Sequence, residues 1–344
     1  MRRRAFMFAA LAMPLAYGGP AAYGGPAAHP TMYPQVRRGT RLRFPRDHGA
    51  HPEYRTEWWY ATGWLERRGA PIGFQVTFFR ARPAWNIANP STFAPRQVLL
   101  AHAAIADPVH GRLKHDERAA REGFALAGAS TRTTGAWIDD WRFELQGDVY
   151  RTKIAASGFD LALELAASRA PLLQGASGFS RKGPRAGEAS YYYSRSHLEA
   201  SGMLDGEAVR GSAWLDHEWS SQYLAPEASG WDWCGLNFDD GTALMAFRIR
   251  ARKGGVYYAP EGVAFTPLRS WRSPRTGVDY PVAMRVEVNR HSYELEPLMD
   301  DQELDARAST GTIYWEGAVR VRQAGQEVGR GYLELTGYWR PMTL

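Results

Sequence analysis

The segment His51–Glu66, HPEYRTEWWYATGWLE, decides the fold. Two neighbouring tryptophans in it, Trp58 and Trp59, cannot both face a single core. A β-strand resolves this, because successive side chains of a strand point to opposite faces of the sheet. Trp59 then lies on one face, while Trp58, Tyr60 and Trp64 line the other. Both faces are apolar, so both must be covered or must enclose a cavity.

The rest of the chain repeats this kind of pattern. Short alternating segments are separated by turn signals, and a helical period is almost absent. The Asp-Gly step at 240–241, between two alternating runs, is a strong hairpin signal. Further predicted strands include residues 72–81, 97–107, 159–168, 189–204, 209–221, 230–238 and 242–252.

Many short strands at near-regular spacing favour antiparallel sandwiches or barrels. The 344 residues suffice for two domains of ordinary size. We therefore expect an all-β protein with two similar halves that meet near residues 211–230. The expected division is 1–41 for a leader and tether, 42–210 for a first domain and 211–344 for a second.

The N-terminus has the pattern of an export signal. Arg2, Arg3 and Arg4 precede a short apolar run over residues 5–16, which has the length of a signal-peptide core and is too short to span a bilayer. The Arg pair also resembles a twin-arginine signal. The repeat AYGGPA that follows is typical of a flexible tether. We expect a periplasmic or secreted protein, exported by the Sec or the twin-arginine route; an uncleaved tail is the alternative.

Composition and motifs exclude several classes of function. The net charge of +6 is spread along the chain, which does not favour nucleic acid as a partner. The single cysteine, Cys234, allows no intramolecular disulfide and is expected to be buried. HExxH, CxxC, Gly-rich phosphate-loop and GxSxG patterns are all missing from the sequence. We therefore expect no cofactor and no metal.

The densest polar cluster beside aromatic residues is WLDHEWSSQY, residues 214–223. In a strand, His217 shares a face with Trp219, while Asp216 and Glu218 point to the other face. A histidine between apolar neighbours is either a general acid or base or a core residue satisfied by hydrogen bonds.

At this point the sequence resembles a known family. The blocks HPEYRTEWWYATGWL, GFQVTFFR, AHAAIAD, WLDHEWSSQ and GWDWCGLNFDDGTALMAFRIR occur in the order typical of the AttH / carotenoid 1,2-hydratase (CrtC-like) family, over roughly residues 42–340. The resemblance implies two consecutive lipocalin-like antiparallel β-barrel domains, often exported, often described as predicted secreted hydrolases and similar in architecture to fungal decalin-forming pericyclases. It also implies an ABC-type export permease as a partner.

The resemblance also bears on chemistry. Carotenoid hydratases of this family protonate an isoprenoid double bond and let water capture the cation, and His217 and Trp219 match the DHxW block near which their polar residues lie. The resemblance further implies an Asp on the strand after WDW, but TALMAFRIRAR has no acid there. This departure argues against carotenoid hydration.

These observations together predict a cavity for a long hydrophobic molecule such as a lipid, isoprenoid or polyketide. Aromatic faces bury hydrocarbon and stabilise a passing carbocation. The expected lining residues are Trp58, Tyr60, Trp219, Trp231 and Trp233.

For catalysis we expect a hydratase-like, hydrolase-like or isomerase-type proton transfer with His217 as the acid/base residue. Glu57 would orient it, with Tyr192 or Arg195 nearby. The alternative is that His217 and Glu57 form a buried structural pair joining the two domains. At the level of function, the alternative is a non-catalytic accessory protein or lipid carrier of an export system, in which the aromatics are only core.

Overall fold

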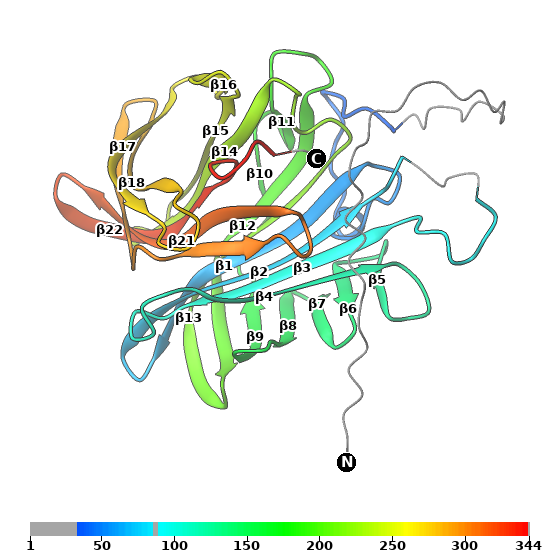
Figure 1. Ribbon diagram of the computed structural model, residues 1–344, viewed down its shortest axis with the longest axis horizontal. Helices are drawn as coiled ribbons and strands as arrows, with labels where there is room; N and C mark the ends of the chain where they lie inside the picture. Colours follow the sequence, from blue (N-terminus) through cyan, green and yellow to red (C-terminus); the bar gives the residue numbers. More distant parts are fainter. Residues whose placement is uncertain (1–32, 85–88, 343–344) are drawn as a thin grey trace. The chain divides into compact units, whose positions relative to one another are not determined.

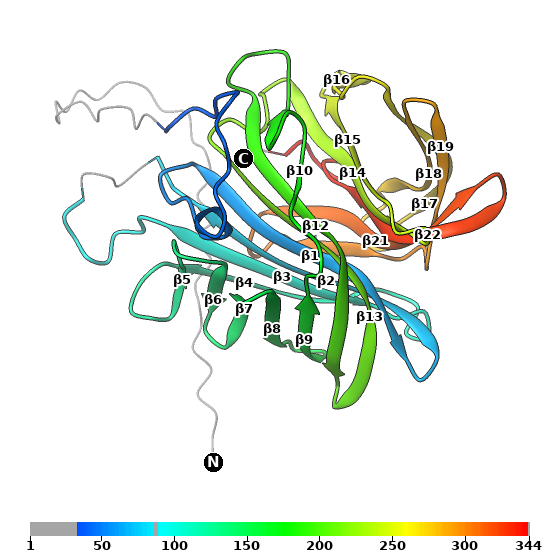
Figure 2. The same cartoon turned by 180° about the vertical axis from the view of Figure 1, so that it is seen from behind.

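The chain folds into antiparallel strands almost throughout. The computed structural model describes residues 33–84 and 89–342, and Figures 1 and 2 show it from opposite sides. The only helical element in these ranges is a 3-10 turn, Arg46–His48. Among the described residues no helix is long and apolar enough to span a membrane. The predicted signal segment lies outside the described ranges.

The first sheet has 13 strands and is built around the aromatic segment that opens the chain's fold. β1 (Thr56–Arg67) lies between β2 (Ala70–Ala81) and β13 (Glu207–Ser220). The order is β4-β3-β2-β1-β13-β12-β9-β8-β7-β6-β5, with β10 and β11 added to β12. The remaining bounds are β3 (Val98–Ala106), β4 (Lys114–Arg121), β5 (Ala127–Ala129), β6 (Gly135–Ile138), β7 (Trp141–Gln146), β8 (Val149–Ala155), β9 (Asp160–Ala166), β10 (Leu172–Leu173), β11 (Phe179–Arg181) and β12 (Ala189–Leu204).

The second sheet has nine strands in the order β16-β15-β14-β22-β21-β19-β18-β17, with β20 added to β21. Its first hairpin turns at the predicted Asp-Gly step, where Gly241 has φ +84°. The bounds are β14 (Ala228–Phe238), β15 (Ala243–Ala251), β16 (Val256–Tyr258), β17 (Val263–Arg272), β18 (Asp279–Val288), β19 (His291–Pro297), β20 (Glu303–Ala306), β21 (Thr312–Gln323) and β22 (Gln326–Leu335). The predicted all-β, two-barrel fold is confirmed, as one nearly closed barrel and one half-barrel.

The alternation predicted for β1 is present and separates two hydrophobic clusters. Trp59 belongs to the interior of the first sheet. Tyr60 and Trp64 point the other way and pack against Trp233 and Tyr332 of the second sheet. The second sheet has its own interior, which includes the buried Cys234. One face of β1 therefore stabilises the first sheet, and the other forms the contact between the two sheets.

The passage between the sheets lies later than the expected boundary at 210/211. That boundary falls within β13, which pairs along its length with β1 and β12 of the first sheet. The chain enters the second sheet only between Ser220 and Ala228. Because β13 is hydrogen-bonded on both sides to strands of the first sheet, the WLDHEWS segment is part of that sheet. The division into two folding domains otherwise stays a prediction.

Candidate functional site

The predicted contact between Glu57 and His217 is present, because the two residues lie on adjacent strands. The Nε2 atom of His217 is 2.9 Å from Oε1 of Glu57, and its Nδ1 atom is 3.2 Å from the Tyr193 hydroxyl. Both residues are completely buried. They lie on the face of β1 and β13 that carries Trp59, whose ring stacks on His217 at 4.8 Å. The pair therefore lies inside the first sheet and does not join the two sheets.

Glu57 is held by several donors besides His217. The Nε atom of Arg80 donates to Oε2 at 2.8 Å, and the backbone amide and Nδ1 of His51 both lie 2.8 Å from its carboxylate. Although burial opposes ionisation, Arg80 and the two histidines hold the pKa of Glu57 well below its usual range. A carboxylate saturated in this way is an internal counter-ion. The contacts favour the structural alternative for Glu57 and His217.

His51, Glu57 and His217 are also the one group in the described part of the chain whose ligand atoms lie close enough for a metal ion, all within 4.8 Å. Glu57, however, is the hydrogen-bond acceptor of both imidazoles, and its second oxygen binds Arg80. The positive charge of Arg80 opposes a cation at this place. As arranged, these residues fit an ion-pair cluster and not a metal site.

Two more expected site residues lie on this inner face. Trp219 stacks on His51, with ring centroids 3.8 Å apart and planes 6° from parallel. Arg195 donates to the carbonyl of Arg169 at 2.8 Å, and its guanidinium lies beside His48. Neither side chain lines the cavity that Trp58 and its neighbours form.

That cavity, here called the inter-sheet cavity, lies between the two sheets and measures about 310 Å³. Cavities of this size hold drug-sized ligands. Four of the five predicted lining residues are present, and Tyr192 joins them. Its aromatic lining residues are Trp58, Tyr60, Phe79, Tyr192, Tyr223, Trp231, Trp233, Tyr314 and Trp339.

Five carboxyl groups also line the inter-sheet cavity: Glu57, Asp216 and Glu218 from the first sheet, and Glu316 and Glu334 from the second. Asp216 and Glu218 do point away from His217, as the alternation predicts. The cavity, however, lies on their side of β13 and not on the side of His217. The titratable side chains that face the cavity therefore include these carboxyls and His102, but not His217.

Asp216 has a complete set of donors. Its oxygens accept hydrogen bonds from the Tyr192 hydroxyl at 2.7 Å, the Ser194 hydroxyl at 2.5 Å and the Trp214 indole at 2.7 Å. The Trp233 indole in turn donates to Tyr192 at 3.0 Å. Burial nevertheless raises the pKa of Asp216 to about 7. Its protonation state thus changes close to neutral pH.

Glu218 has a cation of its own. The Lys182 ammonium lies 2.7 Å from Oε1 of Glu218, and Ser190 donates to the same oxygen. Lys182 is buried between aromatic rings, with Nζ 4.1 Å from the centroid of Phe247. Burial lowers the pKa of Lys182 and raises that of Glu218, so desolvation opposes the charges of both partners. The two groups form a buried ion pair.

Glu316 and Glu334, here called the carboxyl pair, have no such compensation. They lie directly opposite each other on β21 and β22. Glu334 accepts one hydrogen bond, from the Trp231 indole at 3.0 Å. Glu316 is 2% exposed, and its neighbouring donors are the neutral hydroxyls of Tyr60 and Tyr314, neither of which reaches it with ideal hydrogen-bond geometry. Burial, followed by the charge of Glu334, raises the pKa of Glu316 well above its usual range.

Burial also raises the pKa of Glu334. Two acids in one dry site share the cost of ionisation, so at least one holds a proton at a pH where an ordinary glutamate is ionised. The carboxyl pair is thus a proton donor that remains loaded near neutral pH.

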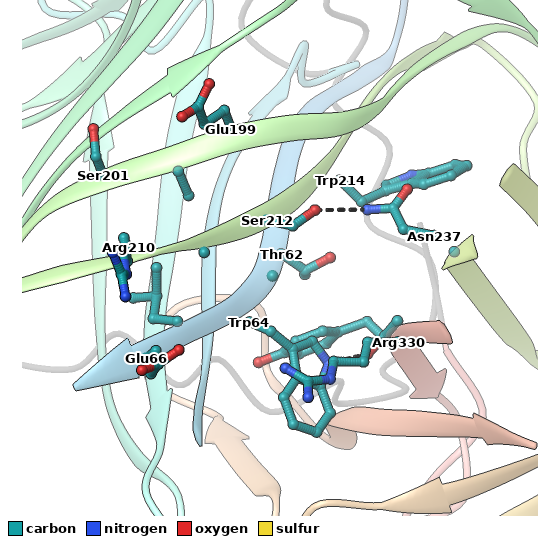
Figure 3. A pocket seen from close by; sticks show the side chains of 17 residues that line it. Thr62, Trp64, Glu66, Glu199, Ser201, Arg210, Ser212, Trp214, Asn237 and Arg330 are labelled. Atoms are coloured by element: carbon teal, nitrogen blue, oxygen red, sulfur yellow. Dashed lines mark hydrogen bonds between the residues drawn. The ribbon is translucent and has the colours of Figure 1, made fainter. Parts of the chain in front are cut away.

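A second cavity, of about 380 Å³, is lined by residues of β1, β12, β13, β14 and β22, strands that also contribute to the first (Figure 3). Thr62 and Trp64 line it where Trp58 and Tyr60 line the first. Arg330 lies over the Trp64 ring, 5.1 Å from its centroid. Trp214 lines this second cavity, while its indole N–H reaches Asp216 of the first. Aromatic side chains therefore separate two cavities that lie end to end.

Glu316 and Glu334 were not predicted as site residues, although the sequence contains a signal for them. Glu316 stands in TIYWEGAVRV, a buried strand in which Tyr314 and Ala318 occupy the same face. Glu334 stands in GYLELTGYW, where it is half-buried between the buried Leu333 and Leu335. A lone acid at a buried position of an apolar strand is costly, and perturbed acids of this kind gather at functional sites. Only the pairing of β21 with β22 shows that the two meet.

Comparisons with known proteins agree with this architecture. The model of the AttH-like family matches residues 35–338. A crystal structure described as an AttH from Nitrosomonas europaea is 49% identical, with a TM-score of 0.83, and the match covers 89% of this chain and 99% of that one. Kievitone hydratase from Nectria haematococca is 14% identical, with a TM-score of 0.60, covering 89% and 96%.

No curated protein matches the chain. The kievitone hydratase likeness shows the fold alone, whereas the family match spans most of the chain. By its sequence and by its structure, the protein belongs to the AttH-like family.

Proposed function

We propose that this AttH-like protein binds a long apolar molecule, such as a lipid, isoprenoid or polyketide, in the inter-sheet cavity and transfers a proton to or from it. The observation that carries the proposal is the carboxyl pair, Glu316 and Glu334, in a cavity walled by aromatic rings. A buried acid without a counter-ion still holds its proton at neutral pH, so it is available there as a general acid.

The proposed chemistry is hydration, its reverse, or isomerisation of a carbon–carbon double bond. The alkene π electrons take a proton from a carboxyl group, and a carbocation forms at the other carbon. The faces of Trp58, Trp231 and Trp233 stabilise that charge. Water then adds to the cation and returns a proton to the carboxylate, which gives hydration; loss of a neighbouring proton gives isomerisation.

The reaction class has a parallel in the fold. The protein of the same fold described above is named a hydratase, for kievitone. At 14% identity this likeness carries no site residue across. The support for proton transfer therefore comes from the carboxyls of this chain.

The test combines ligand capture with isotope exchange. The protein is incubated in D2O with panels of terpenoids, polyketides and fatty acyl compounds, and native mass spectrometry detects retained ligands. Mass spectrometry of the extract then detects carbon-bound deuterium or added heavy water. Glu316→Gln and Glu334→Gln are compared with Glu287→Gln, a change at an exposed position of β18.

We expect a retained ligand that gains deuterium with the parent protein and with Glu287→Gln, and that gains none with either cavity variant. A ligand that is retained without any exchange in the parent protein would favour the carrier or accessory role. Unchanged exchange in both cavity variants would overturn the assignment of the carboxyl pair.

Export and an ABC-type permease remain part of the proposal. The support is the N-terminal pattern of Arg2 to Arg4 followed by an apolar run. N-terminal sequencing of native protein from separated cell fractions tests it, and an intact Met1 in the cytoplasm contradicts it.

A further inference from the structure

The inter-sheet cavity has an excess of negative charge. Of its five carboxyls, Glu57 is paired with Arg80 and Glu218 with Lys182, while the other three have no ion-pair partner in the described part of the chain. Asp216 is held by neutral donors alone. Within the described ranges, the carboxyl pair is likewise met by neutral donors alone: the Trp231 indole at Glu334 and the Tyr60 and Tyr314 hydroxyls beside Glu316.

The two arginines that border the cavity do not balance this charge. Arg80 is committed to Glu57 and Gln97 and to two backbone carbonyls. Arg340 is exposed and lies over the Trp339 ring, 4.2 Å from its centroid. Buried acids normally have a partner, so a ligand that fits here brings hydrogen-bond donors or a positive charge.

The aromatic walls favour positive charge over a neutral donor. Trp58, Tyr60, Tyr223, Trp231 and Trp233 surround the same space. Tyr223 meets Trp58 and Trp231 edge-on, with ring centroids 4.8 and 5.5 Å away. Rings arranged around a cavity in this way form the cage that recognises organic ammonium groups, because their faces are electronegative.

We propose that the natural ligand is an apolar molecule that carries a basic nitrogen, and that its ammonium group binds between the carboxyl pair and the aromatic walls. The inference rests on the proposed function, for which it names the ligand class. One member of the carboxyl pair ionises when the ammonium group binds and releases its proton, while the other keeps the proton that the proposed chemistry uses.

The experiment compares three probes of one chain length, used below their micelle concentrations: dodecylamine, dodecanol and dodecanoate. Isothermal titration calorimetry at pH 7, in two buffers of different ionisation enthalpy, gives both the affinity and the number of protons released. We expect the amine to bind at least about tenfold more tightly than the alcohol, about 1.4 kcal/mol, with net proton release. Dodecanoate should bind most weakly.

Glu316→Gln and Glu334→Gln should abolish the preference for the amine while leaving dodecanol affinity unchanged, and Glu287→Gln should change neither. Equal affinity for amine and alcohol overturns the inference but leaves an apolar ligand site in place. A preference for the amine that survives in the Glu316→Gln/Glu334→Gln double variant also overturns it, since the preference then arises elsewhere. If no probe binds, both the inference and the proposed function fail.

Discussion

Replacing Glu316 with Gln should stabilise the protein, and by an amount that depends on pH. Gln has the shape of a protonated glutamate but cannot ionise. In the folded protein the pKa of Glu316 is raised, so the native state binds a proton more tightly than the unfolded chain does. The stability of the parent protein therefore falls as pH rises above the unfolded pKa, and it continues to fall until the folded pKa is passed. The variant lacks this loss.

The size of the stabilisation follows from the free energy of keeping Glu316 protonated in the folded state. At pH 7, holding a glutamate protonated against an unfolded pKa of about 4.3 costs as much as about 4 kcal/mol, at about 1.4 kcal/mol per pH unit. For a protein of about 300 folded residues this raises Tm by about 3–6 °C. At pH 4 the gain should be close to zero, because both side chains are then neutral in both states.

The assay is thermal and urea unfolding of the parent, Glu316→Gln, Glu334→Gln, the double variant and Glu287→Gln, at pH 4, 5.5, 7 and 8. Because Glu316 and Glu334 are opposed, either single change relieves their mutual repulsion, and the double variant should gain less than the sum of the singles. A gain of equal size at pH 4 and pH 8 would refute the reasoning. So would a gain of the same size in the exposed Glu287→Gln control.

Four further expectations concern the rest of the site, each measured by urea unfolding at pH 7. Glu57→Gln should lower the free energy of unfolding by about 3–5 kcal/mol, since it leaves a buried guanidinium without its counter-ion. His217→Gln should lower it by about 1–3 kcal/mol without altering ligand retention. Unchanged stability together with lost proton exchange would instead show that His217 is catalytic. Lys182→Met should cost about 3–5 kcal/mol, most of it recovered by adding Glu218→Gln, and a double variant no better than the single would contradict the ion pair. Gly235→Ala should cost about 1–3 kcal/mol, because its Cβ would lie 2.6 Å from one tryptophan ring and 3.0 Å from another; a neutral result would show that the aromatic partition yields easily.

The fold was largely predictable, because strand alternation is a local property. The segment containing Trp58 and Trp59 already requires a strand with two apolar faces, and the Asp-Gly step at 240–241 marks a hairpin. The contact of Glu57 with His217 is also present as expected, since each lies in a segment whose alternation clearly predicts a strand.

The chemistry of the cavity was less predictable, because it depends on which face of β13 the second sheet covers. Alternation places the side chains of His217 and Asp216 on opposite faces of β13, but it does not show which of the two faces the cavity. The meeting of Glu316 and Glu334 depends on the register of β21 and β22, a tertiary property. A histidine in an aromatic motif indicates a candidate site in the sequence, whereas two glutamates in separate apolar strands do not.

The strand alternation of β1 has a consequence for how proteins of this architecture diversify. Trp59 belongs to a hydrophobic core, while Trp58 and Tyr60, one residue to either side, line the inter-sheet cavity. Because the cavity lies outside the core of each sheet, substitutions on its walls can alter its shape and polarity while core residues such as Trp59 stay unchanged. The walls of the cavity can therefore diverge through alternate residues of a few strands without loss of the fold.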